Sequence, residues 1–232
     1  MTELIVAANV ASIEELKVFV NKTSSHLDFY KIDSGLFTKT GPDAVKLIKD
    51  SGKKIFLDLK FHDIPSTVAR AAANCIFLGV DMFNVHAMGG FEMMEAAVKE
   101  TWSMHSGIPI ILGVTVLTSI DEAAFRDLFG SPSNNLNQHV LLLAQLAKSA
   151  GLSGVVASPN EIKPIKERCG KDFVVVTPGI RLPGEDKKDQ MRTDTPKGAS
   201  LSGADFIVVG RPIVEARDPV AVIEEYRKEL SQ

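Results

Sequence analysis

The chain has 232 residues, of which 45% are hydrophobic and 24% are charged, a composition typical of a globular protein that buries a sizeable core. Its 26 basic and 29 acidic residues leave a formal net charge of −3, which argues against nucleic acid or a membrane surface as a partner. The two distant cysteines, the absence of a signal-peptide pattern and the absence of a long apolar segment predict a cytoplasmic protein without a disulfide framework.

Short apolar, β-branched runs alternate with segments of helical periodicity along the chain, including helical patterns at 12–20, 42–52, 66–79 and 135–151. The predicted strands are residues 4–9, 29–33, 54–61, 82–87, 109–117, 154–158, 173–180 and 206–211. Strands that alternate with helices through short connections are parallel, and eight such units favour a closed barrel. We therefore predict an α/β fold, a (β/α)8 TIM barrel that forms a single domain over residues 1–232.

The predicted strand 54–61 is apolar but carries Asp58 and Lys60 two positions apart. Because side chains alternate along a strand, both point to the barrel axis, and Lys31 at the end of the preceding strand can approach them. An aspartate between two ammonium groups stays ionised, which makes Asp58 a fixed negative charge and Lys60 a candidate proton donor. The alternative is an interior ion-pair layer that only closes the barrel. Asp63, just before Ile64-Pro65, could equally cap the next helix.

Two segments near the end of the chain point to an anion. The seventh predicted strand ends in TPGIR (177–181) and is followed by a long polar segment, and the eighth ends in VVGRP (208–212). Phosphate sites in this type of barrel are often built from the loops after strands seven and eight. Arg181, Gly210 and Arg211 are therefore candidate phosphate ligands, with ordinary surface arginines and a turn glycine as the alternative.

With these motifs the chain resembles the orotidine 5′-phosphate decarboxylases of the bacterial type. The signature D-x-K-x-x-D-I-P-x-T is intact from Asp58 to Thr67, and Lys31 matches the lysine of the second strand. The segments 114–119, 177–181 and 208–212 and Gln190 follow in the order usual for that family. The D-x-K-x-x-D trio alone is shared with related sugar-phosphate aldolases and decarboxylases.

The resemblance implies that the protein decarboxylates orotidine 5′-phosphate to UMP and CO2 in pyrimidine biosynthesis, without a metal or an organic cofactor. Lys60 would stabilise and protonate the C6 carbanion, and Asp58 would face the substrate carboxylate. A homodimer is also implied, in which Asp63 and Thr67 reach the site of the neighbouring subunit. The catalytic residues would be Lys31, Asp58, Lys60 and Asp63, and the substrate-binding residues Asn9, Ile64, Thr67, Thr118, Arg181, Gln190, Gly210 and Arg211.

The chain departs from that family at the ends of the first two strands. Asn9 stands where an aspartate usually holds the ribose hydroxyls, and Asp33, followed by Ser34-Gly35, stands where a glycine is usual. Either Asp33 replaces the carboxylate lost at position 9, or it pairs with Lys31 and disturbs the array. Two alternatives stay open: a catalytically impaired variant that binds the nucleotide phosphate, and a metal-dependent sugar-phosphate aldolase or decarboxylase of the same superfamily.

Overall fold

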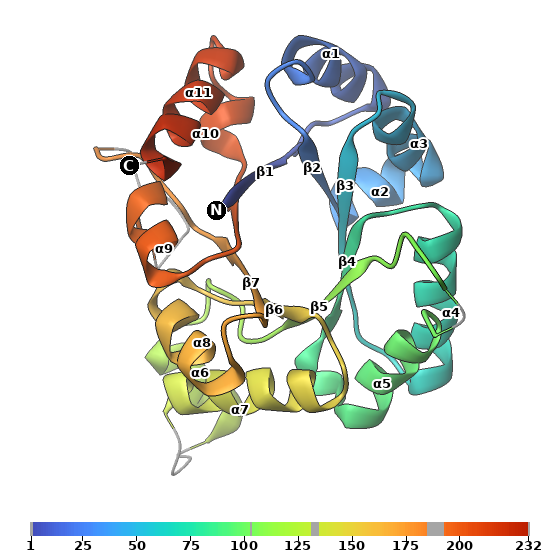
Figure 1. Ribbon diagram of the computed structural model, residues 1–232, viewed down its shortest axis with the longest axis vertical. Helices are drawn as coiled ribbons and strands as arrows, with labels where there is room; N and C mark the ends of the chain where they lie inside the picture. The colour runs from blue at the N-terminus through green and yellow to red at the C-terminus, as the bar shows by residue number, and fades with distance from the viewer. Residues whose placement is uncertain (1, 103, 131–134, 185–192, 232) are drawn as a thin grey trace.

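A computed structural model describes residues 2–102, 104–130, 135–184 and 193–231. Eight parallel strands close into one barrel in the order of the sequence, each paired with its neighbours and the last with the first (Figure 1). The strands are β1 Glu3–Ala7, β2 Phe29–Asp33, β3 Lys54–Phe61, β4 Met82–His86, β5 Ile110–Val114, β6 Gly154–Val156, β7 Val174–Pro178 and β8 Phe206–Val209. The predicted (β/α)8 barrel is confirmed. The predicted strands run up to three residues too far at their carboxyl ends, because apolar residues such as Val116 continue into the mouth of the barrel.

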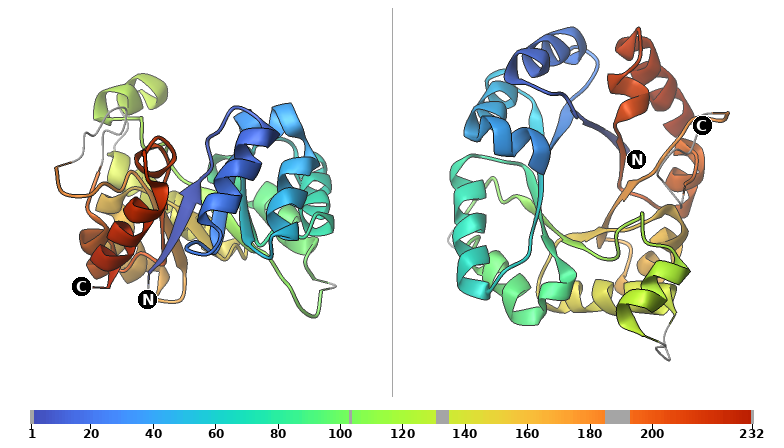
Figure 2. Two further views of the ribbon diagram at one scale, coloured as in Figure 1. Left: turned by 90° about the horizontal axis from the view of Figure 1, so that it is seen from above. Right: turned by 180° about the vertical axis from the view of Figure 1, so that it is seen from behind.

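Helices form an outer ring around the strands, as Figure 1 and the right view of Figure 2 show. Side chains cap several of them where the sequence offers a suitable residue: Ser12 accepts a hydrogen bond from the backbone of Glu15 at the start of α1, and Asn135 forms a capping box with Gln138 at the start of α7. The helices are α1 Ile13–Thr23, α2 Ser34–Thr40, α3 Pro42–Asp50, α4 Pro65–Phe77, α5 Phe91–Lys99, α6 Glu122–Phe129, α7 Leu136–Ser149, α8 Ile162–Cys169, α9 Pro196–Ser202, α10 Arg211–Val214 and α11 Pro219–Leu230, with 3-10 turns η1 Ala87–Gly89 and η2 Pro159–Glu161.

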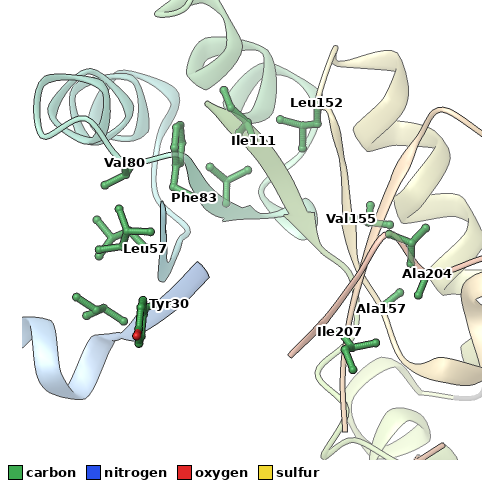
Figure 3. Packing of buried hydrophobic residues seen from close by; sticks show 14 of the residues in the cluster. Tyr30, Leu57, Val80, Phe83, Ile111, Leu152, Val155, Ala157, Ala204 and Ile207 are labelled. Atoms are coloured by element: carbon green, nitrogen blue, oxygen red, sulfur yellow. The ribbon is translucent and has the colours of Figure 1, made fainter. Parts of the chain in front are cut away.

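The core has two layers. The outer layer lies between the strands and the helices and includes Leu57 and Phe83 (Figure 3). The inner layer fills the barrel axis with Phe29, Phe56 and Phe206 among other apolar side chains. Because the inner layer takes residues from the beginnings of several strands, it closes the amino-terminal half of the barrel and leaves the carboxyl-terminal mouth for polar groups. In the described part of the chain, no helix combines the length and the apolar character needed to cross a bilayer.

Strand β3 is irregular where its charged residues lie. Leu57 pairs with Phe83 on β4, but the next pair is Phe61 with Val85, so β3 has two extra residues in this interval. Lys60 has a φ of 52°, and no other non-glycine residue among those described has a positive φ. Such a bulge bends a strand and redirects its side chains. The regular alternation predicted for 54–61 therefore ends before Lys60.

Candidate active site

A cavity of about 430 Å³ lies at the carboxyl-terminal mouth of the barrel, where this type of fold places its active site. Apolar side chains of the inner core layer, such as Phe56 and Val208, form part of its lining, and the charged residues of β2 and β3 join them. Most of the residues predicted for the site meet here. The polar and glycine residues in its lining are Asn9, Lys31, Asp58, Lys60, Thr118, Gly179, Arg181, Gly210 and Arg211.

The charged array predicted from the sequence is present as a chain of ion pairs. Lys31 Nζ lies 2.7 Å from Asp58 Oδ2, and Lys60 Nζ lies 2.6 Å from Asp58 Oδ1. Burial alone would raise the pKa of the Asp58 carboxyl, but the charges and hydrogen bonds of Lys31 and Lys60 outweigh it and lower that pKa to about 2. Asp58 is thus a fixed carboxylate. The side chain of Lys60, 37% exposed, is the more accessible of the two ammonium groups.

One polar residue of the site was missed from the sequence. Asn84, in the middle of β4, is completely buried, and its Nδ2 donates a hydrogen bond to Asp58 Oδ1 at 2.7 Å. Its Oδ1 accepts a hydrogen bond from the backbone N–H of Lys60 at 2.8 Å. The signal was an asparagine between the apolar residues Phe83 and Val85 of a strand, since a buried amide without partners is costly.

Two histidines stack on each other near Lys60. The ring of His62 stacks on that of His86, with ring centroids 5.2 Å apart and planes at 21°. Burial lowers the pKa of His86, and the proximity of His62 and Lys60 lowers it further. His86 is therefore a neutral buried imidazole rather than a charged member of the array.

Three of the predicted site residues do not line the cavity of their own chain: Asp63, Ile64 and Thr67. Asp63 is exposed, and its Oδ1 accepts a hydrogen bond from the backbone of the next residue, Ile64, at 2.6 Å. Helix α4 starts at Pro65 without a side-chain cap, so the alternative of Asp63 as a helix cap is wrong. Ile64 is 64% exposed beside it.

The candidate phosphate ligands converge on one side of the cavity. Arg181, Gly210 and Arg211 all line it, at the ends of β7 and β8. Arg181 is buried, and its Nη1 donates a hydrogen bond to the carbonyl of Ile180 at 2.8 Å. Two arginines at one end of a cavity favour an anionic group there. Gln190, also predicted for this site, lies outside the described residues.

The two departures from the resemblance have separate surroundings. Asn9 lines the cavity, close to Gly210. Asp33 caps α2 instead, because its Oδ1 accepts a hydrogen bond from the backbone N–H of Leu36 at 2.9 Å. Asp33 does not line the cavity, and the carboxylate paired with Lys31 is that of Asp58. Asp33 therefore neither replaces a carboxylate at position 9 nor disturbs the array.

Within the described ranges, no group of three or more His, Cys, Asp or Glu side chains is arranged to hold a metal ion. A buried carboxylate between two ammonium groups, in a cavity that two arginines also line, can hold an anionic substrate and stabilise negative charge that develops next to Lys60.

Comparison with known proteins gives one consistent result. Residues 2–226 match the family described as "Orotidine 5'-phosphate decarboxylase / HUMPS family". A protein of Moorella thermoacetica named orotidine 5′-phosphate decarboxylase is 44% identical over 232 residues, covering 98% of this chain and 92% of its own. One of the same name from Legionella pneumophila (strain Corby) is 44% identical, covering 98% and 99%. The crystal structure of orotidine 5′-phosphate decarboxylase from Lactobacillus acidophilus has a TM-score of 0.86 at 39% identity, with 100% of both chains covered.

Proposed function

The chain belongs to the orotidine 5′-phosphate decarboxylase / HUMPS family, and on this premise we propose that it decarboxylates orotidine 5′-phosphate to UMP and CO2. It is then a carbon–carbon lyase of pyrimidine biosynthesis and acts in the cytoplasm. The observation that carries the proposal is the Lys31–Asp58–Lys60 array in the lining of a cavity that Arg181 and Arg211 also line.

In the proposed reaction the C6–carboxyl bond breaks, CO2 leaves, and the electron pair remains on C6 of the pyrimidine. The ammonium group of Lys60 stabilises this carbanion and donates the proton that completes UMP. Asp58, held ionised by both lysines, faces the substrate carboxylate. The repulsion between these two negative charges falls as the carboxylate leaves as CO2. Lys60 regains its proton from water, which reaches its partly exposed side chain. These steps use groups of the protein, the substrate and one proton from water.

Substrate binding is assigned to the other residues of the cavity. Arg181, Gly210 and Arg211 hold the phosphate, together with Gln190 as implied by the family resemblance. Thr118 contacts the base, and Asn9 offers its amide to the ribose hydroxyls. Binding energy from the phosphate, remote from C6, helps to hold the pyrimidine against the array.

We also propose a homodimer in which Asp63, Ile64 and Thr67 serve the site of the partner. Asp63 is exposed and does not line its own cavity, which supports this assignment. Exposed apolar side chains lie on adjoining elements, Met88 at 39% and Phe91 at 40%, and α4 and α5 stand side by side (Figure 1). A shared site predicts complementation. An equal mixture of Asp63→Ala and Lys60→Ala subunits regains about a quarter of wild-type activity, since half of the dimers have one intact site.

The test of function is to follow the pyrimidine absorbance of orotidine 5′-phosphate in the presence of a chelator, with Lys60→Ala as the control. The expected result is loss of the orotate chromophore with wild-type protein alone. Tight binding of the nucleotide without a spectral change would instead identify the catalytically impaired binder. Activity on an open-chain sugar phosphate that a chelator abolishes would identify the metal-dependent aldolase or decarboxylase.

A further inference from the structure

Asn84 is the buried polar residue closest in structure to the irregular part of β3. It is in register with Leu112, which belongs to the inner core layer, so its side chain points to the barrel axis. It is completely buried. A buried amide lowers the stability of the fold unless both its N–H groups and its carbonyl oxygen have hydrogen-bond partners.

Both ends of the amide are used, and both contact the array. Asn84 Oδ1 accepts the hydrogen bond from the backbone N–H of Lys60, and Asn84 Nδ2 donates to Asp58 Oδ1. A left-handed conformation is unfavourable for a residue with a side chain, and it turns the N–H away from the regular ladder. Asn84 provides a partner for this N–H, which stabilises the turn that carries Lys60 to the cavity.

The second hydrogen bond orients the carboxylate. Asp58 Oδ1 receives both Lys60 Nζ at 2.6 Å and Asn84 Nδ2 at 2.7 Å, while Oδ2 is left to Lys31 Nζ at 2.7 Å. With three donors divided in this way, the plane of the Asp58 carboxylate is fixed. The amide must present its oxygen to Lys60 and its nitrogen to Asp58, because the reverse orientation would set an oxygen against a carboxylate.

We propose that Asn84 is a positioning residue for the decarboxylation, which acts through Lys60 and Asp58 without touching the substrate. This inference rests on the proposed function, since the array it positions is the proposed catalytic group. Removal of Asn84 lets the ammonium of Lys60 and the carboxylate of Asp58 move from their places, and small displacements of catalytic groups lower kcat more than they weaken ligand binding.

The substitution Asn84→Asp separates positioning from packing, because it is nearly isosteric. It keeps the acceptor for Lys60 but donates to Asp58 only when its carboxyl is protonated. The titratable residues hydrogen-bonded to Asn84 are Asp58 and Lys60 on β3. Lys31 on β2 is paired with Asp58, and His86 lies two residues further along β4. Two carboxyl groups in contact resist joint ionisation, which raises the pKa of one of them. The activity of this variant relative to wild type should therefore rise as the pH falls.

The experiment measures kcat and KM for orotidine 5′-phosphate and Kd for UMP, between about pH 5.5 and pH 8.5, with far-UV circular dichroism to check folding. Asn84→Ala should lower kcat about 10- to 100-fold at every pH and change Kd for UMP less than about 3-fold. Asn84→Asp should recover about 10-fold relative to wild type between the highest and lowest pH. Thr115→Val is the matched control. It removes the hydrogen bond from Thr115 Oγ1, just after β5, to the backbone carbonyl of Val156 on β6. Thr115 is buried and is not itself among the residues that line the cavity, so this change should leave kcat unchanged.

The outcomes distinguish the two proposals. If wild-type protein does not convert orotidine 5′-phosphate, the proposed function is overturned, and the inference about Asn84 with it. If wild-type protein is active but Asn84→Ala has normal kcat, or Thr115→Val loses as much as Asn84→Ala, the positioning role is overturned. Should Asn84→Ala fail to fold, Asn84→Asp decides, because a ratio to wild type that does not change with pH contradicts the role.

Discussion

The positive φ of Lys60 predicts an unusual order of stability between two substitutions. Lys60→Gly and Lys60→Ala both remove the ammonium and its ion pair with Asp58, and both keep the backbone N–H that Asn84 accepts. They differ in the presence of a Cβ on a residue at φ 52°. The difference between them therefore isolates the backbone conformation from the loss of charge.

The size of the effect follows from two opposing contributions. A left-handed conformation costs a residue with a Cβ about 1–2 kcal/mol, and glycine avoids this cost. Glycine loses more conformational entropy on folding, about 0.5–1 kcal/mol relative to alanine. Lys60→Gly should therefore be more stable than Lys60→Ala by about 0.5–1 kcal/mol in the free energy of unfolding, which is the reverse of the usual order.

The same pair of substitutions at Lys54 provides the control. Lys54 is the exposed first residue of β3 and is not among the residues with a positive φ. There Lys54→Ala should be more stable than Lys54→Gly by about 0.5–1 kcal/mol. Equilibrium unfolding in urea measures all four variants, and the preference should reverse between the two positions. If alanine is the more stable residue at both, the left-handed conformation of Lys60 is not a source of strain and the reasoning fails.

Three further predictions concern the ligand and the pH. Arg211→Ala should weaken UMP binding about 10- to 100-fold by titration calorimetry and leave uridine binding unchanged, since it removes a charge-assisted contact to phosphate; equal losses for both ligands would argue against a phosphate role. Asn9→Asp should lower KM for orotidine 5′-phosphate a few-fold, about 2- to 5-fold, by restoring a charged acceptor for the ribose, and unchanged kinetics would show that position 9 does not contact the sugar. The pKa of His86 is lowered from 6.5 by burial first and by His62 and Lys60 next, so below this pH the unfolded state takes up a proton that the folded state does not. The free energy of unfolding should therefore fall as the pH drops below 6.5, and urea titrations of His86→Gln should show a shallower fall.

The barrel was predictable because its signals are local. The alternation of apolar runs with helical periodicity appears within windows of a dozen residues, and the closed order of strands follows from the rules for parallel connections. The inward direction of Asp58 also follows from strand periodicity, and the structure confirms it in the lining of the cavity. Cys75 and Cys169 are buried free thiols, as their spacing indicated.

The bulge at Lys60 was not predictable from its own segment, because LDLKF reads as a regular alternation. The conformation depends on Asn84, which is 24 residues away in the chain and is brought next to β3 only by the closure of the barrel. Asp33 was misjudged for the opposite reason. The sequence analysis linked Asp33 to Asn9 or to Lys31, but its side chain instead caps the helix that follows it. That helix, α2 at Ser34–Thr40, had not been predicted.

The inner core layer that closes the amino-terminal half of the barrel also limits how substrate and products reach and leave the cavity. Among the described residues, Phe29, Phe56 and Phe206 fill the barrel axis on the amino-terminal side, and the cavity lies at the carboxyl-terminal mouth. The mouth is therefore the expected route by which substrate enters and both products leave. CO2 that forms beside Lys60 would leave past the nucleotide, which the phosphate still holds in the same cavity. UMP must then leave the cavity before the next substrate can bind, so product and substrate compete for the same site.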